Sequence, residues 1–310
     1  MIWIILGLIG LFLCLGLFLF YAACGRINRI TKNLDEMLSR PVYRISREES
    51  LQARDWLAAQ KPERVEVRSY DGLRLVADFV PCPQARGTIL FFHGWRSRPL
   101  ADFGPALRSY YAKGLNLLLV HQRGQGPSGG RFMTFGIKER RDVHSWVQWH
   151  GARFGTEAPI LLSGLSMGAS TVLMACGEPF SANVRGVIAD CGFTSPKEII
   201  RSVCRSCHVP PWAVVPVMGL FAKLFAGFGF SAYSTVTAMK QTQVPILFAH
   251  GEADGFVPCE MTRRAYAACA SPDKTLLLVK EAHHGTSYLL ERTRYEEAIS
   301  RFLERNLVSV

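Results

Sequence analysis

The chain has 310 residues, of which 49% are hydrophobic, and its formal net charge at pH 7 is +11. This length fits one large α/β domain with an appendage, and the apolar content is sufficient for a sizeable core. Its basic residues are scattered and form no recognised nucleic-acid-binding module, so we interpret the excess charge as a source of solubility and of surface attraction to anionic lipid, and do not expect a nucleic-acid partner.

The chain opens with an apolar run, residues 2–23, that contains no charged side chain. As a helix this run would be about 33 Å long, enough to cross the hydrocarbon core of a bilayer. Three basic residues follow it: Arg26, Arg29 and Lys32. The positive-inside rule then predicts a single-pass span with the rest of the chain in the cytoplasm. A secretory signal is one alternative, and the missing basic segment ahead of the run and the length of the run disfavour it. A lipoprotein signal ending before Cys24 is the other, and Tyr21 fits its pattern poorly.

Residues 26–60 are charged and mixed in composition. We expect a juxtamembrane linker with a short amphipathic helix anchored by Leu51, Trp56 and Leu57.

From residue 61 onward, strand-length apolar runs alternate with helical patterns. Two alternating segments around Asp71-Gly72 predict a β-hairpin. Six continuous apolar runs predict buried strands: 88–92, 116–120, 160–162, 187–189, 246–248 and 275–279. Helical patterns separate many of them, for example at 100–113, 139–150 and 295–307. This alternation predicts an α/β fold, a mostly parallel sheet of about eight strands with helices on both faces.

The segment at about 194–243 interrupts the alternation and is rich in Phe, Pro and Gly. We expect a small helical lid whose apolar side chains either pack on the body or line an acyl or aromatic pocket. Within it, Cys204-Arg-Ser-Cys-His208 formally matches the haem-attachment pattern, and we interpret this single match as chance. The nine cysteines are odd in number and lack framework spacing, which predicts reduced, buried thiols.

A Gly-x-Ser-x-Gly match, residues 164–168, lies between an apolar run and a small-residue helical segment. In this strand–turn–helix setting the serine is held in a strained turn with its hydroxyl exposed. The pattern therefore predicts Ser166 as a nucleophile, with the N–H of Met167 as a donor to the oxyanion. The alternative is a glycine-rich turn with an incidental serine.

Two later loops offer a base and an acid for this serine. Asp254 follows the apolar run 246–250 and His284 follows the run 275–279. The order Ser, Asp, His is that of α/β-hydrolases, and it assigns His284 as the base and Asp254 as the group that orients it. Three residues compete for these roles: Asp190 and Glu252 for the acid, and His283 for the base.

The segment Phe92-His93-Gly94-Trp95 ends an early strand. Gly94 lets the backbone turn closely, so the N–H of Trp95 is the candidate for the second oxyanion donor. Trp95 serves equally well as a hydrophobic wall. His93 is expected to brace the loop.

Taken together, these motifs resemble the α/β-hydrolase superfamily over residues 64–310. Within it the chain is similar to bacterial membrane-anchored hydrolases of the prolyl-oligopeptidase and acyl-CoA thioester hydrolase branches. The segment 121–128 departs from their pattern, with His121 where Asp is usual and Gln125 where His is usual. The resemblance implies a catalytic set of Ser166, His284 and Asp254, a small acyl substrate, and no metal or organic cofactor.

The expected organisation is a transmembrane anchor over 1–25, the linker over 26–60, and a hydrolase domain over 61–310. The expected function is a serine hydrolase at the cytoplasmic face of a membrane that cleaves an ester or thioester through an acyl-enzyme. A serine peptidase for short peptides and a catalytically dead, membrane-tethered scaffold are the alternatives. The sequence makes no prediction of the oligomeric state.

Overall fold

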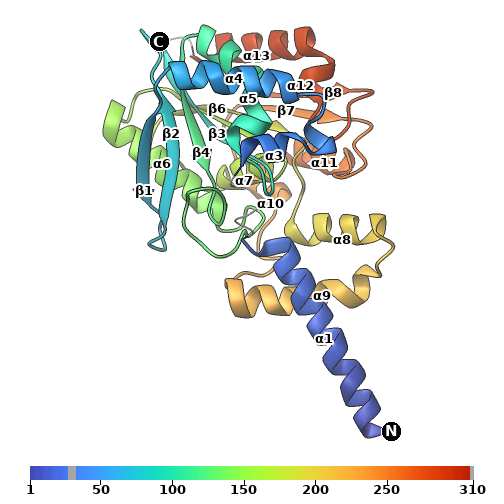
Figure 1. Ribbon diagram of the computed structural model, residues 1–310. Helices are drawn as coiled ribbons and strands as arrows, with labels where there is room; N and C mark the ends of the chain where they lie inside the picture. Colours follow the sequence, from blue (N-terminus) through green and yellow to red (C-terminus); the bar gives the residue numbers. More distant parts are fainter. Residues whose placement is uncertain (27–32, 308–310) are drawn as a thin grey trace.

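The computed structural model describes residues 1–26 and 33–307, and an eight-stranded sheet lies at its centre (Figure 1). The strand order is β1-β2-β4-β3-β5-β6-β7-β8. β2 pairs antiparallel with β1 and with β4, and every other neighbouring pair is parallel. The strands are β1 (Glu63–Arg68), β2 (Arg74–Val80), β3 (Gly87–Phe92), β4 (Leu115–His121), β5 (Ile160–Leu165), β6 (Val184–Asp190), β7 (Ile246–Gly251) and β8 (Lys274–Val279). The predicted mostly parallel sheet of about eight strands is confirmed.

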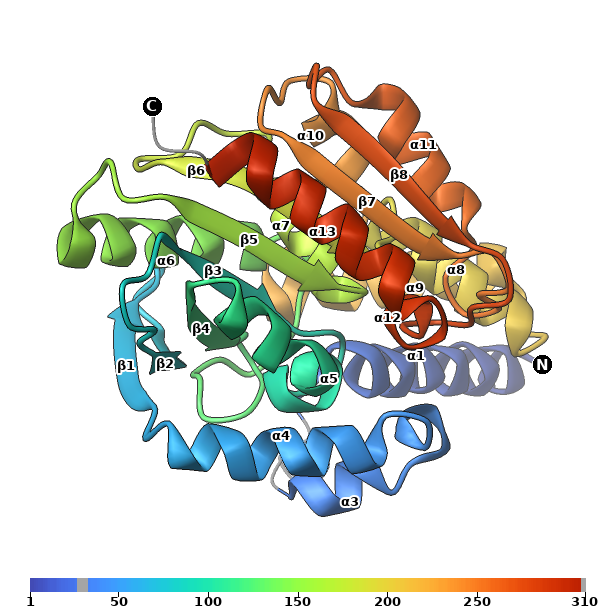
Figure 2. The same ribbon diagram turned by 90° about the horizontal axis from the view of Figure 1, so that it is seen from above.

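Helices cover both faces of this sheet, because successive apolar residues of each central strand point to opposite sides. In β3, Ile89 and Phe91 belong to one core cluster and Leu90 and Phe92 to the other. One cluster packs under α5 (Pro99–Ala112) and α13 (Arg292–Leu307), and the other under α6 (Glu139–Phe154), α7 (Met167–Ala175), α10 (Thr235–Met239) and α11 (Glu260–Ala268). Figure 2 shows α5 and α13 on the near face of the sheet, with α6, α7 and α11 beyond it.

The segment preceding β1 packs against the body along α5. It contains α3 (Leu34–Leu38), a 3₁₀ turn (Pro41–Tyr43) and α4 (Arg47–Ala59). Close approach is possible because Gly104 of α5 lies against the backbone of Ser50, and Trp56 meets Tyr111 edge-on with ring centroids 5.3 Å apart. The part of the expected linker at 33–60 is thus docked on the domain. Residues 27–32 of that linker, with Arg29 and Lys32, lie outside the described residues.

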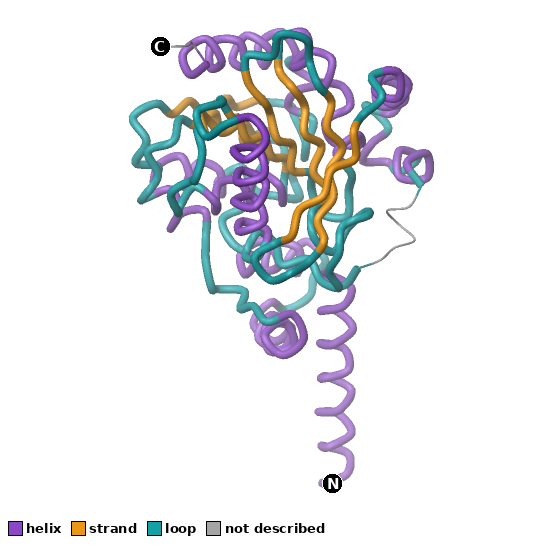
Figure 3. The backbone as a smooth tube through the Cα atoms, turned by 90° about the vertical axis from the view of Figure 1, so that its left-hand side faces the viewer, coloured by secondary structure: helices purple, strands orange, loops and turns teal. Residues whose placement is uncertain are grey.

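The N-terminal helix α1 (Ile2–Cys24) projects from the body (Figures 1 and 3). It is the one helix of the described chain that is long and apolar enough to cross a membrane, a test that a signal sequence also passes. Its last turns are packed into the protein, with Phe20 and Cys24 fully buried. A backbone bridge between Gly25 and Phe132 continues this attachment.

The segment expected as a lid lies between β6 and β7. It forms α8 (Pro196–Ser206), α9 (Pro211–Phe221), a π-helical turn (Ala222–Ala226) and α10. α8 and α9 lie on the side of the body from which α1 projects, and α9 crosses α1 (Figure 1). α10 returns to the sheet, where Ala238 and Met239 join the main core.

Candidate active site

Ser166 occupies the turn between β5 and α7. Its φ of 56° and ψ of −115° lie outside the regions that non-glycine residues ordinarily adopt. The backbone crosses itself closely here, since a Cβ on Gly164 would collide with the backbone at Gly168 and a Cβ on Gly168 would collide with the carbonyl of Phe92. Two glycines are therefore required to hold Ser166 in this conformation. The predicted strand, turn and helix are all present.

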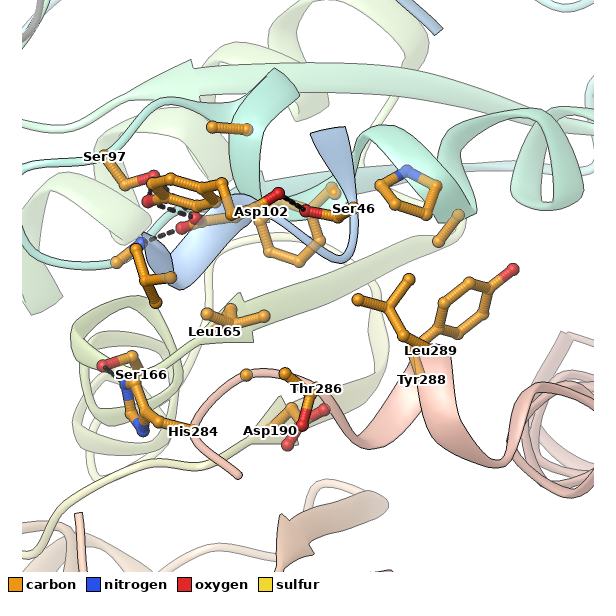
Figure 4. Close-up of a pocket in the computed structure, with 18 of the residues that line it drawn as sticks. Ser46, Ser97, Asp102, Leu165, Ser166, Asp190, His284, Thr286, Tyr288 and Leu289 are labelled. Atoms are coloured by element: carbon orange, nitrogen blue, oxygen red, sulfur yellow. Dashed lines mark hydrogen bonds between the residues drawn. The ribbon is translucent and has the colours of Figure 1, made fainter. Parts of the chain in front are cut away.

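Ser166, His284 and Asp254 lie in a single line of hydrogen bonds. The Nε2 atom of His284 is 2.9 Å from the Oγ of Ser166, and its Nδ1 is 2.7 Å from Oδ2 of Asp254. His284 comes from the loop after β8 and Asp254 from the turn after β7, and Figure 4 shows the imidazole beside Ser166. With the proton on Nδ1 donated to the carboxylate, Nε2 is free to accept the proton of the serine hydroxyl.

The carboxylate of Asp254 is fixed by four contacts. Oδ1 accepts the N–H groups of Phe256 and Val257, both at 2.9 Å, while Oδ2 faces His284 and also the Nε2 of His250 at 3.2 Å. Burial raises the pKa of this carboxyl, but the hydrogen bonds from His250 and His284 outweigh burial and hold the pKa well below its usual range. Asp254 is therefore ionised at neutral pH. The sequence argument missed His250, although its place four residues before Asp254 at the end of β7 was a usable signal.

The residues that competed for these roles have other partners. Asp190 accepts hydrogen bonds from Tyr295 at 3.1 Å and Ser287 at 3.3 Å on the α13 side of the sheet. Glu252 pairs with Arg263. The Nδ1 of His283 bonds the carbonyl of Ala253 at 2.9 Å. The structure therefore brings only the preferred acid and base to Ser166 among the residues considered.

The loop after β3 lies directly against Ser166. A Cβ on Gly94 would be 3.5 Å from the Cβ of Ser166. The N–H of Gly94 donates to Oδ2 of Asp102 at 2.6 Å, and the other carboxylate oxygen accepts from Ser97 at 2.6 Å and Tyr43 at 3.1 Å. Burial raises the pKa of Asp102, and these hydrogen bonds offset part of that effect. Asp102 and Tyr43 hold the loop, and sequence reasoning found neither of them.

The two expected oxyanion donors flank this point. Met167 is the first residue of α7, where backbone N–H groups have no partner within the helix. Trp95 follows Gly94, and its indole N–H donates to the carbonyl of Ala23 at 2.8 Å. The Trp95 side chain is thereby tied to α1, and Trp95 and Ser166 line the same cavities.

The segment 121–128, which departs from the expected family pattern, is nevertheless held by hydrogen bonds to His93 and to α6. The Nδ1 of His93 bonds the carbonyl of Gly94 at 2.9 Å, and its Nε2 accepts the N–H of Gln122 at 3.2 Å. Burial lowers the pKa of His93 to about 3, so it is neutral. Arg123 bonds Asp142 at 2.6 Å through its Nε and so ties the segment to α6.

Two cavities meet at Ser166. One, of about 420 Å³, is partly polar, and Ser46, Asp102 and Thr286 contribute to its walls (Figure 4). Tyr43 and Arg96 also line it. The other, of about 270 Å³, is lined almost wholly by carbon. Its walls come from α1, α8, α9 and nearby loops: Leu19, Ala22, Ala23, Phe135, Phe193, Ile199, Ile200, Val203, Cys204, Cys207, Val209 and Met218. Trp95, Ser166 and Phe256 line both cavities, so the serine hydroxyl lies where a polar and an apolar space join.

One cluster of side chains near the serine has ligand atoms spaced for a metal ion. Atoms of Cys191, Asp254 and His284 lie within 4.8 Å of one another. Burial raises the pKa of the Cys191 thiol well above its usual value, and Asp254 and His284 are bonded to each other. This set therefore does not fit a metal site. Both cysteines of the haem-like pattern are free thiols that line the apolar cavity, Cys204 buried and Cys207 exposed.

Comparison with known proteins agrees with this architecture. A model of the prolyl oligopeptidase family matches residues 102–309. The YqkD protein of Bacillus subtilis is 28% identical over 218 residues, which cover 70% of this chain and 71% of that protein. The bem46 protein of Schizosaccharomyces pombe is 25% identical over 249 residues, which cover 79% of this chain and 77% of that protein. The esterase Pf2001 of Pyrococcus furiosus superposes with a TM-score of 0.67 at 21% identity, covering 82% of this chain and 94% of that one. The predicted α/β-hydrolase fold is confirmed.

Proposed function

Because the chain belongs to the prolyl oligopeptidase family of hydrolases, we propose that it is a serine hydrolase that cleaves a carboxylic ester or thioester through an acyl-enzyme. The observation that carries this proposal is the position of the His284 ring, 2.9 Å from the Ser166 hydroxyl on one side and 2.7 Å from the Asp254 carboxylate on the other.

The reaction follows from these contacts. The Oγ of Ser166 attacks the acyl carbon while Nε2 of His284 accepts the hydroxyl proton. Asp254 stays ionised, accepts the hydrogen bond from the Nδ1–H of His284 and stabilises the imidazolium that forms. The carbonyl oxygen becomes an oxyanion, and the N–H groups of Met167 and Trp95 are its proposed donors. Collapse of this intermediate expels the alcohol or thiol, which receives the proton from His284.

A water molecule completes the cycle. His284 removes a proton from the water, whose oxygen attacks the acyl carbon on Ser166, and the acid product leaves as the proton returns to the serine oxygen. The two cavities support an acyl substrate, because the apolar one suits a hydrocarbon chain and the partly polar one suits the leaving group. All three side chains are present and bonded, which argues against a catalytically dead scaffold.

We further propose that α1 is a single-pass anchor and that the hydrolase domain is cytoplasmic. The 23-residue apolar helix and the basic residues that follow it support this orientation. Alkaline carbonate should leave the protein in the membrane fraction, and protease added to sealed spheroplasts should spare the domain. Release by carbonate, or digestion of the domain in intact spheroplasts, would contradict the anchor or its orientation respectively.

The test of the chemistry is replacement of the nucleophile. Ser166→Ala should lower kcat/KM on p-nitrophenyl esters by roughly 10⁴-fold or more and abolish labelling by a fluorophosphonate. Ser145→Ala, on α6 and away from the site, is the matched control and should behave as wild type. Acyl-CoA and aminoacyl amides, assayed beside the esters, separate ester, thioester and peptide cleavage. Equal ester hydrolysis by wild type and Ser166→Ala would reject the proposal.

A further inference from the structure

The last turns of α1 form a wall of the apolar cavity at Ser166. Leu19, Ala22 and Ala23 line that cavity together with residues of α8 and α9. The carbonyl of Ala23 also accepts the indole N–H of Trp95, a residue common to both cavities. The helix expected only to anchor the protein is therefore part of the site.

The lid helix α9 contacts α1 at a point well before the end of α1 that enters the body. Gly16 of α1 is in contact with Val217 of α9, since a Cβ on Gly16 would overlap that side chain. Gly16 precedes the end of α1 at Cys24 by eight residues, which is about 12 Å along a helix. α9 thus crosses α1 roughly one third of the way from its inner end.

The outer surface of the lid is apolar where it adjoins α1. The stretch 211–226 contains one charged residue, Lys223. Four of the large apolar side chains of α9 and the following π-helical turn are exposed: Trp212 at 80%, Leu220 at 50%, Leu224 at 66% and Phe225 at 50%. This surface adjoins the exposed side chains of α1, because the ring of Phe225 lies 6.2 Å from that of Tyr21, which is 41% exposed. Scattered single apolar residues are ordinary, but a continuous surface of this kind marks an interaction site.

The length of α1 identifies what covers that surface. The helix has 23 residues and is about 35 Å long, and a bilayer core is about 30 Å thick. A span therefore uses nearly the whole helix, including the level at which α9 crosses it. The exposed face of α9 then lies within the hydrocarbon of the adjacent leaflet, where apolar side chains have a lower free energy than they have in water.

The apolar cavity reaches this same region. Cys207 and Val209 line the cavity, Cys207 is exposed, and Trp212 follows three residues after Val209. On the inner side of α8, Ile199, Val203 and Cys204 continue the wall toward Ser166. The apolar cavity therefore extends from the exposed end of α8 at Cys207 to Ser166.

From this geometry we propose that the substrate is an acyl ester of a lipid resident in the bilayer, whose hydrocarbon chain enters the apolar cavity between α1 and the lid. The proposal rests on the serine hydrolase function above. The acyl carbon meets Ser166, the polar alcohol portion occupies the partly polar cavity, and the chain remains in the apolar one. The acyl–oxygen bond breaks as the Ser166 ester forms, the alcohol leaves with the proton from His284, and water then releases the fatty acid.

A cavity-blocking substitution tests the path of the chain. The full-length protein in phosphatidylcholine vesicles should cleave a bilayer-embedded palmitoyl ester at least tenfold faster than the soluble butyryl ester. Val203→Trp should lower the ratio of palmitoyl to butyryl hydrolysis more than tenfold. Ser206→Trp, an exposed position on the same helix, is the matched control and should leave both unchanged.

The outcomes separate the two proposals. Cleavage of butyryl but not palmitoyl ester, or an unchanged ratio of palmitoyl to butyryl hydrolysis in Val203→Trp, overturns the lipid substrate and leaves the serine hydrolase intact. Absence of any ester or thioester cleavage that depends on Ser166 overturns both.

A second measurement does not depend on activity. The fluorescence difference between wild type and Trp212→Phe isolates the emission of Trp212. This emission should be quenched by phosphatidylcholine brominated along the acyl chains and protected from aqueous acrylamide. Quenching by acrylamide without quenching by brominated lipid would place the lid surface in water and overturn entry from the bilayer.

Discussion

Asp102 is expected to act on catalysis through the backbone of the loop beside Ser166. Asp102→Ala removes the acceptor of the Gly94 N–H, now bonded at 2.6 Å, and leaves that donor buried without a partner. An unsatisfied buried donor costs about 1–3 kcal/mol. If the whole cost falls on the transition state, kcat decreases about 5- to 150-fold, since about 1.4 kcal/mol is a factor of ten. Asp102→Asn keeps an oxygen for Gly94 and should retain kcat within threefold, with KM little changed in both variants.

The assay is steady-state hydrolysis of p-nitrophenyl butyrate, with active protein counted by fluorophosphonate titration. Tyr43→Phe is the matched control, because it removes a 3.1 Å hydrogen bond to the same carboxylate and leaves the Gly94 contact in place. It should keep kcat within threefold. A wild-type kcat in Asp102→Ala would show that the loop is held by other contacts. An Asn variant as slow as the Ala variant would show that the negative charge matters and the acceptor does not.

Two further substitutions test the elbow and the core. Gly168→Ala places a Cβ against the carbonyl of Phe92, so it should lower ester hydrolysis more than 100-fold and also lower the melting temperature. In the control Gly229→Ala the new Cβ meets nothing within 4 Å, so neither quantity should change. Equal behaviour of the two variants would contradict the close approach of the backbone at Gly168. Burial lowers the pKa of His150 to about 4. Between pH 6.5 and 4 the unfolded chain therefore binds a proton that the folded chain does not. The free energy of unfolding should fall by about 3 kcal/mol as the pH decreases through that window. His150→Gln should remove this share of the pH dependence in urea unfolding at pH 7, 6, 5 and 4, and parallel curves for the two proteins would refute the assignment.

The central strands were predictable because of where they lie. A parallel strand covered on both faces must be apolar throughout, so a continuous run is enough to locate it. The run at 88–92 became β3 (Gly87–Phe92) and the run at 116–120 became β4 (Leu115–His121). The helical pattern at 100–113 became α5 (Pro99–Ala112), which starts with a proline at a position where its missing N–H costs nothing.

The site residues that sequence reasoning missed act through contacts that leave no periodic pattern. Asp102 binds a backbone N–H eight residues earlier and the hydroxyl of Tyr43, 59 residues away. His250 contacts Asp254 from the end of the preceding strand, and its only sequence signal was its spacing of four residues from Asp254. Ser166, in contrast, was found from its glycines, because the turn itself demands residues without a Cβ.

The helix α1 shows what hydropathy alone leaves undetermined in an N-terminal segment. Lipid tails are as apolar as a leucine side chain, so a sequence has no local signal that separates a residue facing lipid from one facing protein. Phe18 and Tyr21 are exposed, while Phe20, between them, is fully buried against the lid and Phe132. The same ambiguity applies to the lid, whose side chains both pack on the body and line the apolar cavity. Removal of residues 1–25 to obtain a soluble protein would therefore also remove a wall of that cavity, and the chain-length preference of such a truncated protein would not represent that of the full chain.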